Sequence, residues 1–185
     1  MYNILTLSSD MTKTLLLIRH AKSDWSIQGQ KDFDRELNQR GHTDAPRMGA
    51  KLFEMGIKPE LVVSSPAQRT KLTAEYICEQ VKYPVEKIEY NEEIYEASVR
   101  TLLKVVNELD DIYSMVAIVG HNPGFSYLAE YLTGAVIGSL PTCGIVELSF
   151  DFNKWSLASQ NTASMKCFIY PKMDLDESGN KMRVE

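Results

Sequence analysis

Apolar runs with the character of β-strands alternate with helical patterns along most of the chain, and this alternation most restricts its fold. The strand-like runs cover residues 14–18, 61–64, 116–120, 144–150 and 164–170, with a weaker run at 85–90 after Pro84. The helical patterns cover residues 41–55, 67–81, 98–109 and 124–132, with Ser98 as a candidate N-cap and Gly56 as a candidate C-cap. Strands that alternate with helices favour a mostly parallel sheet covered by helices.

The last two strand-like runs have no helix between them, so they are expected to form an antiparallel edge. The predicted fold is a three-layer α/β/α sandwich around a mostly parallel sheet with an antiparallel edge strand. We expect one domain over residues 13–173 and a mobile, polar tail over residues 174–185. Residues 1–12 are expected to form an N-terminal arm, although Met11 leaves open that the first ten residues reflect an upstream start codon.

Composition excludes several classes of partner. The formal net charge is −5 and the sequence pI about 5.3, which argues against nucleic acid or an anionic membrane. No apolar stretch approaches the roughly 20 residues that cross a bilayer, and the N-terminus lacks the pattern of a signal peptide. The three cysteines cannot all pair internally and show no C-x-x-C spacing, which predicts a cytoplasmic, reducing location.

Cationic and protonatable side chains follow three of the expected strands. Arg19 and His20 come directly after the run at 14–18, Arg69 follows the turn after 61–64, and His121 follows the run at 116–120. Ends of parallel strands with the same polarity lie at one edge of a sheet, where ligands bind in open α/β folds. Two arginines and two histidines around one pocket would suit a compact dianion, and a phosphoryl group is the obvious candidate.

The residue types indicate distinct roles in phosphoryl transfer. His20 is the predicted nucleophile, since a neutral imidazole attacks through one nitrogen while the other holds its proton against a backbone carbonyl. Arg19 and Arg69 are predicted to bind the phosphoryl oxygens. His121 is predicted to donate to the same group, beside Asn122 and the backbone N–H groups of the following helix.

The segments that carry these residues resemble a known family. Residues 17–25, Leu-Ile-Arg-His-Ala-Lys-Ser-Asp-Trp, are similar to the Arg-His-Gly signature of the histidine phosphatase superfamily, which includes the phosphoglycerate mutases. Ala21 in place of the usual glycine, the Ser-Ser-Pro-Ala motif at 64–67 and residues 32–41 resemble the SixA phosphohistidine phosphatase branch. The resemblance spans roughly residues 13–170. It implies that His20 is transiently phosphorylated and that Arg19, Arg69 and His121 form the phosphate pocket, without a metal or other cofactor.

The resemblance also bears on two further positions. Mutases of the superfamily usually have asparagine where this chain has Ser26, whose hydroxyl is a candidate phosphate donor. The superfamily commonly places an acidic proton donor after the third strand, which here favours Glu93, with Glu92 and Glu96 as close alternatives. A phosphohistidine substrate with a protonated ring could instead supply its own proton. Asp32, Asp34 and Arg35 are interpreted either as a solvated loop or as part of the pocket rim.

These observations predict a metal-independent phosphatase that acts through phospho-His20 on protein phosphohistidine. The expected partner is a phosphorylated histidine-containing phosphotransfer domain, or else a small phosphorylated substrate. Only about fifty residues separate Ser64 from Val116, which leaves no room for a long lid and disfavours a mutase. A phosphatase of small esters or anhydrides and a non-catalytic phosphate-binding module remain as alternatives. A metal-dependent hydrolase is disfavoured because arginines beside the histidines repel a cation.

Overall fold

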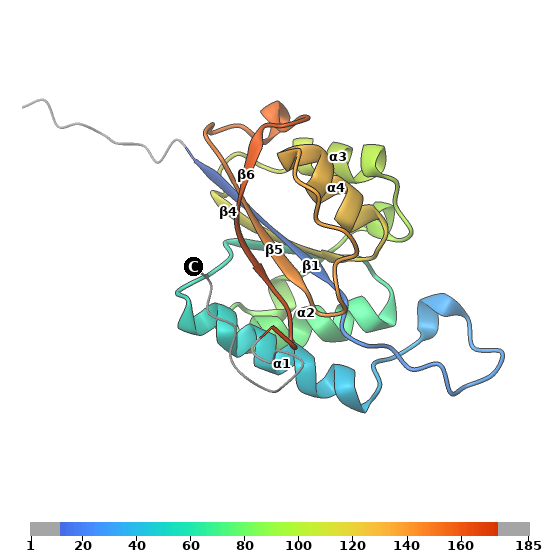
Figure 1. Cartoon of the computed structure of the whole chain (residues 1–185). Helices are drawn as coiled ribbons and strands as arrows, with labels where there is room; N and C mark the ends of the chain where they lie inside the picture. Colours follow the sequence, from blue (N-terminus) through green and yellow to red (C-terminus); the bar gives the residue numbers. More distant parts are fainter. Residues whose placement is uncertain (1–11, 174–185) are drawn as a thin grey trace, which may run out of the picture.

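The computed structural model describes residues 12–173, and within them the predicted sandwich is confirmed. A six-stranded sheet has the order β3-β2-β4-β1-β5-β6 (Figure 1). The strands are β1 (Lys13–Arg19), β2 (Leu61–Ser64), β3 (Glu89–Tyr90), β4 (Met115–Gly120), β5 (Ile145–Phe150) and β6 (Ala163–Ile169). Strands β1 to β4 pair in parallel, whereas β5 runs antiparallel to both β1 and β6.

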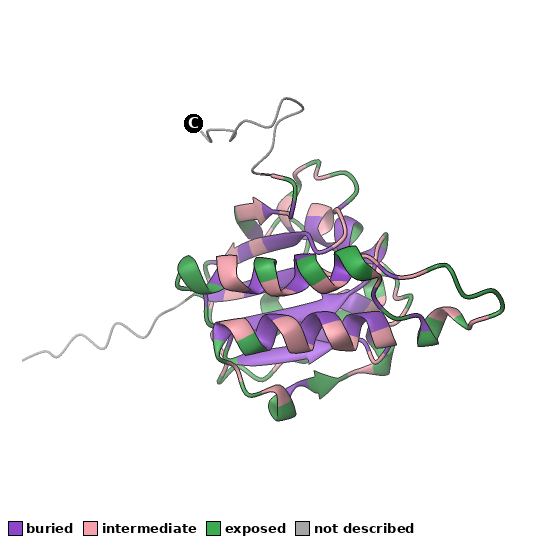
Figure 2. Cartoon of the chain, turned by 90° about the horizontal axis from the view of Figure 1, so that it is seen from below, coloured by how far each residue is buried: buried purple, intermediate pink, exposed green. Residues whose placement is uncertain are grey.

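Helices cover both faces of this sheet. They are α1 (Gln39–Glu54), α2 (Gln68–Val81), α3 (Val99–Asn107) and α4 (Gly124–Thr133). Alternate residues of β1 point to opposite faces: Leu15 and Leu17 pack in the core under α3 and α4, and Leu16 and Ile18 in the core under α1 and α2. Figure 2 shows helices that turn a buried side toward the sheet and an exposed side outward. A strand buried on both faces explains why residues 15–18 of β1 are all apolar.

The boundaries of the elements follow local signals. The side chain of Asn38 caps α1 by accepting a hydrogen bond from the backbone of Gly41, and Ser98 caps α3 as predicted. Gly56 has a φ of +74° just beyond α1, which suits the predicted C-cap. Gly41 also has to be small, since a Cβ there would lie 2.3 Å from the carbonyl oxygen of Lys22. This close approach holds the chain after β1 against the start of α1.

The weak strand expected at 85–90 differs from the prediction. Its first half is a 3-10 turn, η2 (Val85–Lys87), and only Glu89 and Tyr90 pair with β2. Pro84 has a fixed φ, and its carbonyl accepts the turn's hydrogen bond from the backbone of Lys87 at 3.0 Å. Three more 3-10 turns occur in the described part of the chain: η1 (Asp32–Asp34), η3 (Glu92–Ile94) and η4 (Trp155–Leu157).

Two sequence predictions concern the ends of the chain. Most of the expected arm, residues 1–11, and the expected tail, residues 174–185, lie outside the described residues. Between residues 12 and 173, no helix combines the length and the apolar character needed to cross a membrane.

Candidate active site

The four residues predicted from the strand ends meet in one pocket. Arg19 ends β1, His20 follows it, Arg69 lies in the first turn of α2, and His121 follows β4. The backbone of His20 donates to the carbonyl of Gly120 at 3.0 Å, which brings the ends of β1 and β4 together. The two imidazole rings lie with their centroids 5.4 Å apart. The pocket has a volume of about 280 Å³.

His20 has the geometry of a neutral nucleophile. Its Nδ1 lies 2.8 Å from the carbonyl oxygen of Ala21. Because a carbonyl only accepts, Nδ1 carries the ring proton and Nε2 holds the free lone pair. Burial lowers the pKa of His20 to about 4, and the charges of Arg69 and Arg19 act in the same direction. The side chain is therefore unprotonated at neutral pH.

His121 has both ring nitrogens engaged with protein groups. Arg69 donates through Nη2 to Nδ1 at 3.2 Å, so the ring proton lies on Nε2, 2.8 Å from the hydroxyl of Ser65. Burial, followed by the charge of Arg69, lowers the pKa of His121 to about 3. Ser65 begins the turn between β2 and α2, the helix that carries Arg69, and its place in the Ser-Ser-Pro motif was the only sequence signal for this contact.

Both arginines are fixed by backbone carbonyls and keep donors without protein partners. Arg19 donates through Nη1 to the carbonyl of Leu140 at 2.6 Å. Arg69 donates through Nη1 to the carbonyl of Asp32 at 2.5 Å. Among the described residues, the Nε groups of Arg19 and Arg69 are buried without a hydrogen-bond partner. Buried cationic donors that lack partners fit a site for an anion.

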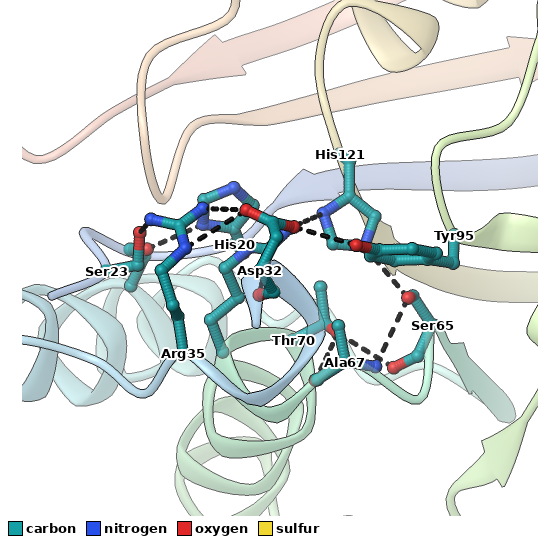
Figure 3. Close-up of polar contacts among 11 residues, drawn as sticks. His20, Ser23, Asp32, Arg35, Ser65, Ala67, Thr70, Tyr95 and His121 are labelled. Atoms are coloured by element: carbon teal, nitrogen blue, oxygen red, sulfur yellow. Dashed lines mark hydrogen bonds and ion pairs between the residues drawn. The ribbon is translucent and has the colours of Figure 1, made fainter. Parts of the chain in front are cut away.

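Asp32 is the centre of a polar network at the side of this pocket (Figure 3). Its carboxylate accepts hydrogen bonds from Arg69 Nη2 and from the hydroxyl of Tyr95, each at 2.8 Å, and forms an ion pair with Arg35. Burial opposes its ionisation, but the bonds from Tyr95 and Arg35 and the charge of Arg69 lower its pKa to about 2. Of the two interpretations, the structure therefore favours the pocket rim for Asp32 and Arg35, whereas Asp34 is exposed and is not among the pocket-lining residues.

Arg35 brings a third guanidinium to the pocket. It is buried, and its Nη1 donates to the hydroxyl of Ser23 at 3.0 Å. The ring of Trp25 lies against the guanidinium, 3.5 Å from its carbon to the ring centroid. Sequence reasoning did not single out Ser23. The signal that locates it is structural, because Ser23 forms an isolated antiparallel bridge with Leu37.

Two predicted residues lie away from the pocket and one lies in it. Glu93 is exposed and forms an ion pair with Lys104 at 2.8 Å, whereas the neighbouring Glu96 lines the pocket. Ser26 is exposed and is not among the pocket-lining residues. Asn122 lines the pocket, and its side-chain amide donates to the carbonyl of Leu140 at 3.0 Å.

Glu96 is a glutamate among the residues that line the pocket, and its backbone φ is +50°. A non-glycine residue in the left-handed region is uncommon and is typical of turns and of functional sites. Within residues 12–173, no group of three or more His, Cys, Asp or Glu side chains is arranged to hold a metal ion.

Comparisons with known proteins place this site in a family. The profile of the histidine phosphatase superfamily (branch 1) matches residues 15–99. An uncharacterised chloroplastic protein of Arabidopsis thaliana is 31% identical over 160 residues, which cover 82% of this chain and 72% of that protein. A 2,3-bisphosphoglycerate-dependent phosphoglycerate mutase of Bartonella tribocorum is 41% identical over 75 residues, which cover 38% of this chain and only 35% of the mutase.

Solved structures share the whole fold. A protein assigned as phosphohistidine phosphatase SixA from Agrobacterium tumefaciens superposes with a TM-score of 0.72 at 27% identity, over 86% of this chain and 98% of that chain. A protein histidine phosphatase SixA in complex with tungstate shares the fold with a TM-score of 0.70 at 20% identity, over 85% and 97% of the two chains. The chain belongs to the histidine phosphatase superfamily and is a phosphatase enzyme.

Proposed function

We propose that this enzyme hydrolyses protein phosphohistidine through a phosphorylated His20, without a metal ion or other cofactor. One observation carries the proposal: a neutral histidine, its proton held by the carbonyl of Ala21, opens its free nitrogen into a pocket that also contains Arg19, Arg69 and His121. The similarity to proteins described as SixA phosphohistidine phosphatases supports the choice of substrate.

The first step transfers the phosphoryl group to the enzyme. Nε2 of His20 uses its lone pair to form a bond to phosphorus while the phosphorus–nitrogen bond of the substrate breaks. Arg19 and Arg69 balance the charge on the phosphoryl oxygens. A substrate phosphohistidine whose second ring nitrogen is protonated leaves as neutral imidazole, so this step requires no acid from the enzyme.

The second step returns His20 to its starting state. In the phosphoenzyme, Nδ1 still carries its proton, so the ring is a phosphoimidazolium. Water attacks phosphorus, the bond to Nε2 breaks, and its electrons restore the neutral ring while dihydrogen phosphate leaves. The contact between Nδ1 and the carbonyl of Ala21, at 2.8 Å, holds the required proton in place through both steps.

His121 and Ser65 form a pair that suits charge stabilisation. A serine hydroxyl both donates and accepts, so Ser65 satisfies Nε2 of His121 in either tautomer. When a phosphoryl oxygen takes the Nη2 group of Arg69, Nδ1 of His121 loses its donor and becomes available to carry the proton. In that tautomer His121 donates to the phosphoryl group, as the sequence predicts.

The leaving group distinguishes phosphohistidine from phosphate esters. An alkoxide leaves poorly unless it gains a proton, and Glu96 is the glutamate that lines the pocket. We therefore propose Glu96, in place of Glu93, as the proton donor for ester substrates. Small phosphate esters or anhydrides remain the second candidate substrates because this carboxylate is present.

Access to the pocket favours a phosphoryl group displayed on a protein. The chain between β2 and β4 is occupied by α2, β3, α3 and the short 3-10 turns, and none of these forms a long insert over the site. Mutases that retain a small intermediate need closure against water. The mutase relatives also match over little more than a third of their length. A binding module without catalysis is disfavoured because simple binding does not require an unprotonated, unhindered nucleophile.

The free cysteines fit a reducing location such as the cytosol. Cys78, Cys143 and Cys167 are all unpaired, and burial raises the pKa of Cys78 to about 12. A thiol with so high a pKa is inert at neutral pH, which suits a packing role and not a catalytic one.

A trapping experiment tests the proposed chemistry. The enzyme is incubated with a labelled histidine phosphotransfer domain and quenched, and we expect an acid-labile, base-stable phosphoenzyme. The label is expected to disappear in His20→Ala and to persist in His42→Ala, a histidine on α1 that bonds to Tyr76. Circular dichroism confirms folding of both variants. Full turnover by folded His20→Ala would overturn the nucleophile assignment, and loss of activity with a chelator would overturn the metal-free mechanism.

A further inference from the structure

The segment between Ser23 and Arg35 exposes large apolar side chains beside the catalytic pocket. Trp25 is 72% exposed, Ile27 61% and Phe33 38%. This segment projects from the body of the domain at the end of the sheet that holds the site (Figures 1 and 2). Large apolar side chains exposed on one projecting segment beside a pocket are candidates for contact with another molecule. We call Trp25, Ile27 and Phe33 the rim patch.

Two members of the rim patch are tied directly to catalytic-pocket residues. The ring of Trp25 stacks on the guanidinium of Arg35 at 3.5 Å, and Trp25 itself lines the pocket. The ring of Phe33 packs edge-on against Tyr95 with centroids 5.2 Å apart. Arg35 and Tyr95 both bind the carboxylate of Asp32. Trp25 and Phe33 are therefore held in defined positions relative to the phosphate-binding groups, and Ile27 lies two residues from Trp25 on the same segment.

The dimensions of the pocket limit which substrates can contact this surface. A volume of about 280 Å³ accommodates a phosphoryl group with a small leaving group, and Ile27 is not among the residues that line it. A substrate confined to the pocket would touch Trp25 and leave Ile27 in water. Contact with the whole rim patch requires a substrate whose surface extends well beyond its phosphoryl group.

We propose that the rim patch is the docking surface for a folded protein that presents its phosphohistidine to His20. This inference rests on the proposed function. The matching partner surface is apolar and surrounds the phosphorylated histidine, so that it covers Trp25 and Ile27 while the dianion enters among the arginines. A second copy of this chain is a poorer occupant, because a molecule seated on Trp25 would block the pocket that catalysis needs open.

The test compares two exposed isoleucines. Ile27→Ser removes an apolar side chain from the rim patch, and Ile112→Ser removes one that is 72% exposed before the amino end of β4, at the opposite edge of the sheet. Each variant is assayed on a histidine phosphotransfer domain phosphorylated on its histidine, and on free phosphohistidine. We expect Ile27→Ser to lower kcat/KM for the phosphoprotein about fivefold, a change of about 1 kcal/mol. Its activity on free phosphohistidine, and both activities of Ile112→Ser, are expected to match the wild type.

Each other outcome has a definite meaning. Equal losses on both substrates would show that Ile27 supports the pocket, and no loss on either would show that the surface is unused; both overturn the docking proposal. A wild-type dimer that Ile27→Ser converts to a monomer in light scattering would identify a second copy as the occupant, which also overturns it. Wild-type enzyme that hydrolyses free phosphohistidine but not the phosphoprotein would refute the proposed protein substrate itself.

Discussion

One hollow lies at the amino ends of the parallel strands, which we call the amino edge of the sheet, and another lies at their carboxyl ends, the carboxyl edge. The two hollows differ in the residues that line them. The hollow at the amino edge has a volume of about 770 Å³, and the charged side chains around it, such as Lys58, Lys82 and Glu86, are exposed. The catalytic pocket at the carboxyl edge is about 280 Å³, yet buried Arg69, His20 and His121 line it. The comparison teaches that the burial of convergent ionisable groups, more than the size of a cavity, identifies the chemical site.

The difference has an energetic origin. Exposed lysines and glutamates remain hydrated and cost the fold little. Buried cations lose hydration, and in the carboxyl-edge pocket a single carboxylate, Asp32, is shared between Arg35 and Arg69. Two histidines also have pKa values held below their ordinary range at this edge. Such an arrangement is typical of a site where a ligand supplies the missing negative charge.

The strongest test of this difference substitutes one cationic residue in each hollow by the other cationic residue type. Arg69→Lys keeps the charge but loses the planar fork that reaches Asp32 and His121 together, so we expect kcat/KM to fall on the order of 100-fold. Lys58→Arg makes the reverse exchange at the amino edge and is expected to leave kcat/KM unchanged. Steady-state kinetics on a phosphorylated phosphotransfer domain would measure both.

The two variants also test whether the hollow at the amino edge has no part in turnover. A loss of activity in Lys58→Arg comparable to that in Arg69→Lys would show that both hollows contribute to turnover. Matching thermal unfolding curves for wild type and variants would confirm that the kinetic change arises in the site and not from loss of the folded enzyme.

The pH dependence of turnover provides the next prediction. In the proposed mechanism His20 must be neutral to attack phosphorus, and its pKa of about 4 means that the neutral form predominates above that pH. At pH 5.5 an ordinary histidine of pKa 6.5 is about 90% protonated, which would lower kcat/KM about eightfold from its value at pH 7. We expect kcat/KM to change by no more than about twofold over this interval and to fall only below pH 5.

The pH profile needs substrates with different ionisations. Profiles measured with two phosphorylated compounds whose own pKa values differ would show whether the fall in kcat/KM at low pH, the acid limb, arises from the enzyme or from the substrate. A shared limb with an apparent pKa near 6.5 would contradict the buried, neutral state of His20.

The sequence predicts a feature of this structure well where a short stretch of residues is enough to place it. The strands, the helices and the meeting of Arg19, His20, Arg69 and His121 follow from short patterns, because each residue ends a strand, directly follows one or lies in the first turn of a helix. These positions need no knowledge of distant contacts. The same local logic anticipated the caps at Ser98 and Gly56.

Residues placed by long-range contacts were not predictable in this way. Glu93 and Glu96 are both exposed and lie three residues apart, and the choice between them depends on an ion pair to Lys104 and on the positive φ of Glu96. Ser23 and Ser26 pose the same problem: the bridge to Leu37 turns Ser23 inward and leaves Ser26 exposed.

These two glutamates give a smaller, substrate-dependent prediction. Glu96→Gln removes the carboxyl group that lines the pocket and is expected to lower kcat for a phosphate monoester about tenfold, below the usual general-acid effect because the side chain is exposed to water. Turnover of phosphohistidine is expected to stay within about twofold, since its imidazole carries its own proton. Glu93→Gln is the matched control and should leave the turnover of both substrates unchanged. Equal losses on ester and phosphohistidine would assign Glu96 a role in binding and not in proton transfer.

The smallest expected effect concerns Asp32, which makes the catalytic pocket differ from a simple cationic hollow. Its carboxylate occupies Arg69 Nη2, the same group that a phosphoryl oxygen needs. Because the hydrogen bonds from Tyr95 and Arg35 and the charge of Arg69 hold the pKa of Asp32 at about 2 despite its burial, the carboxylate competes with phosphate at every pH where the enzyme works. Asp32→Asn removes that charge but keeps an oxygen that accepts from Tyr95, so competitive inhibition by inorganic phosphate should become about threefold tighter, in line with a modest ion pair. Weaker inhibition would show that the charge of Asp32 is needed mainly to orient Arg69 for the substrate.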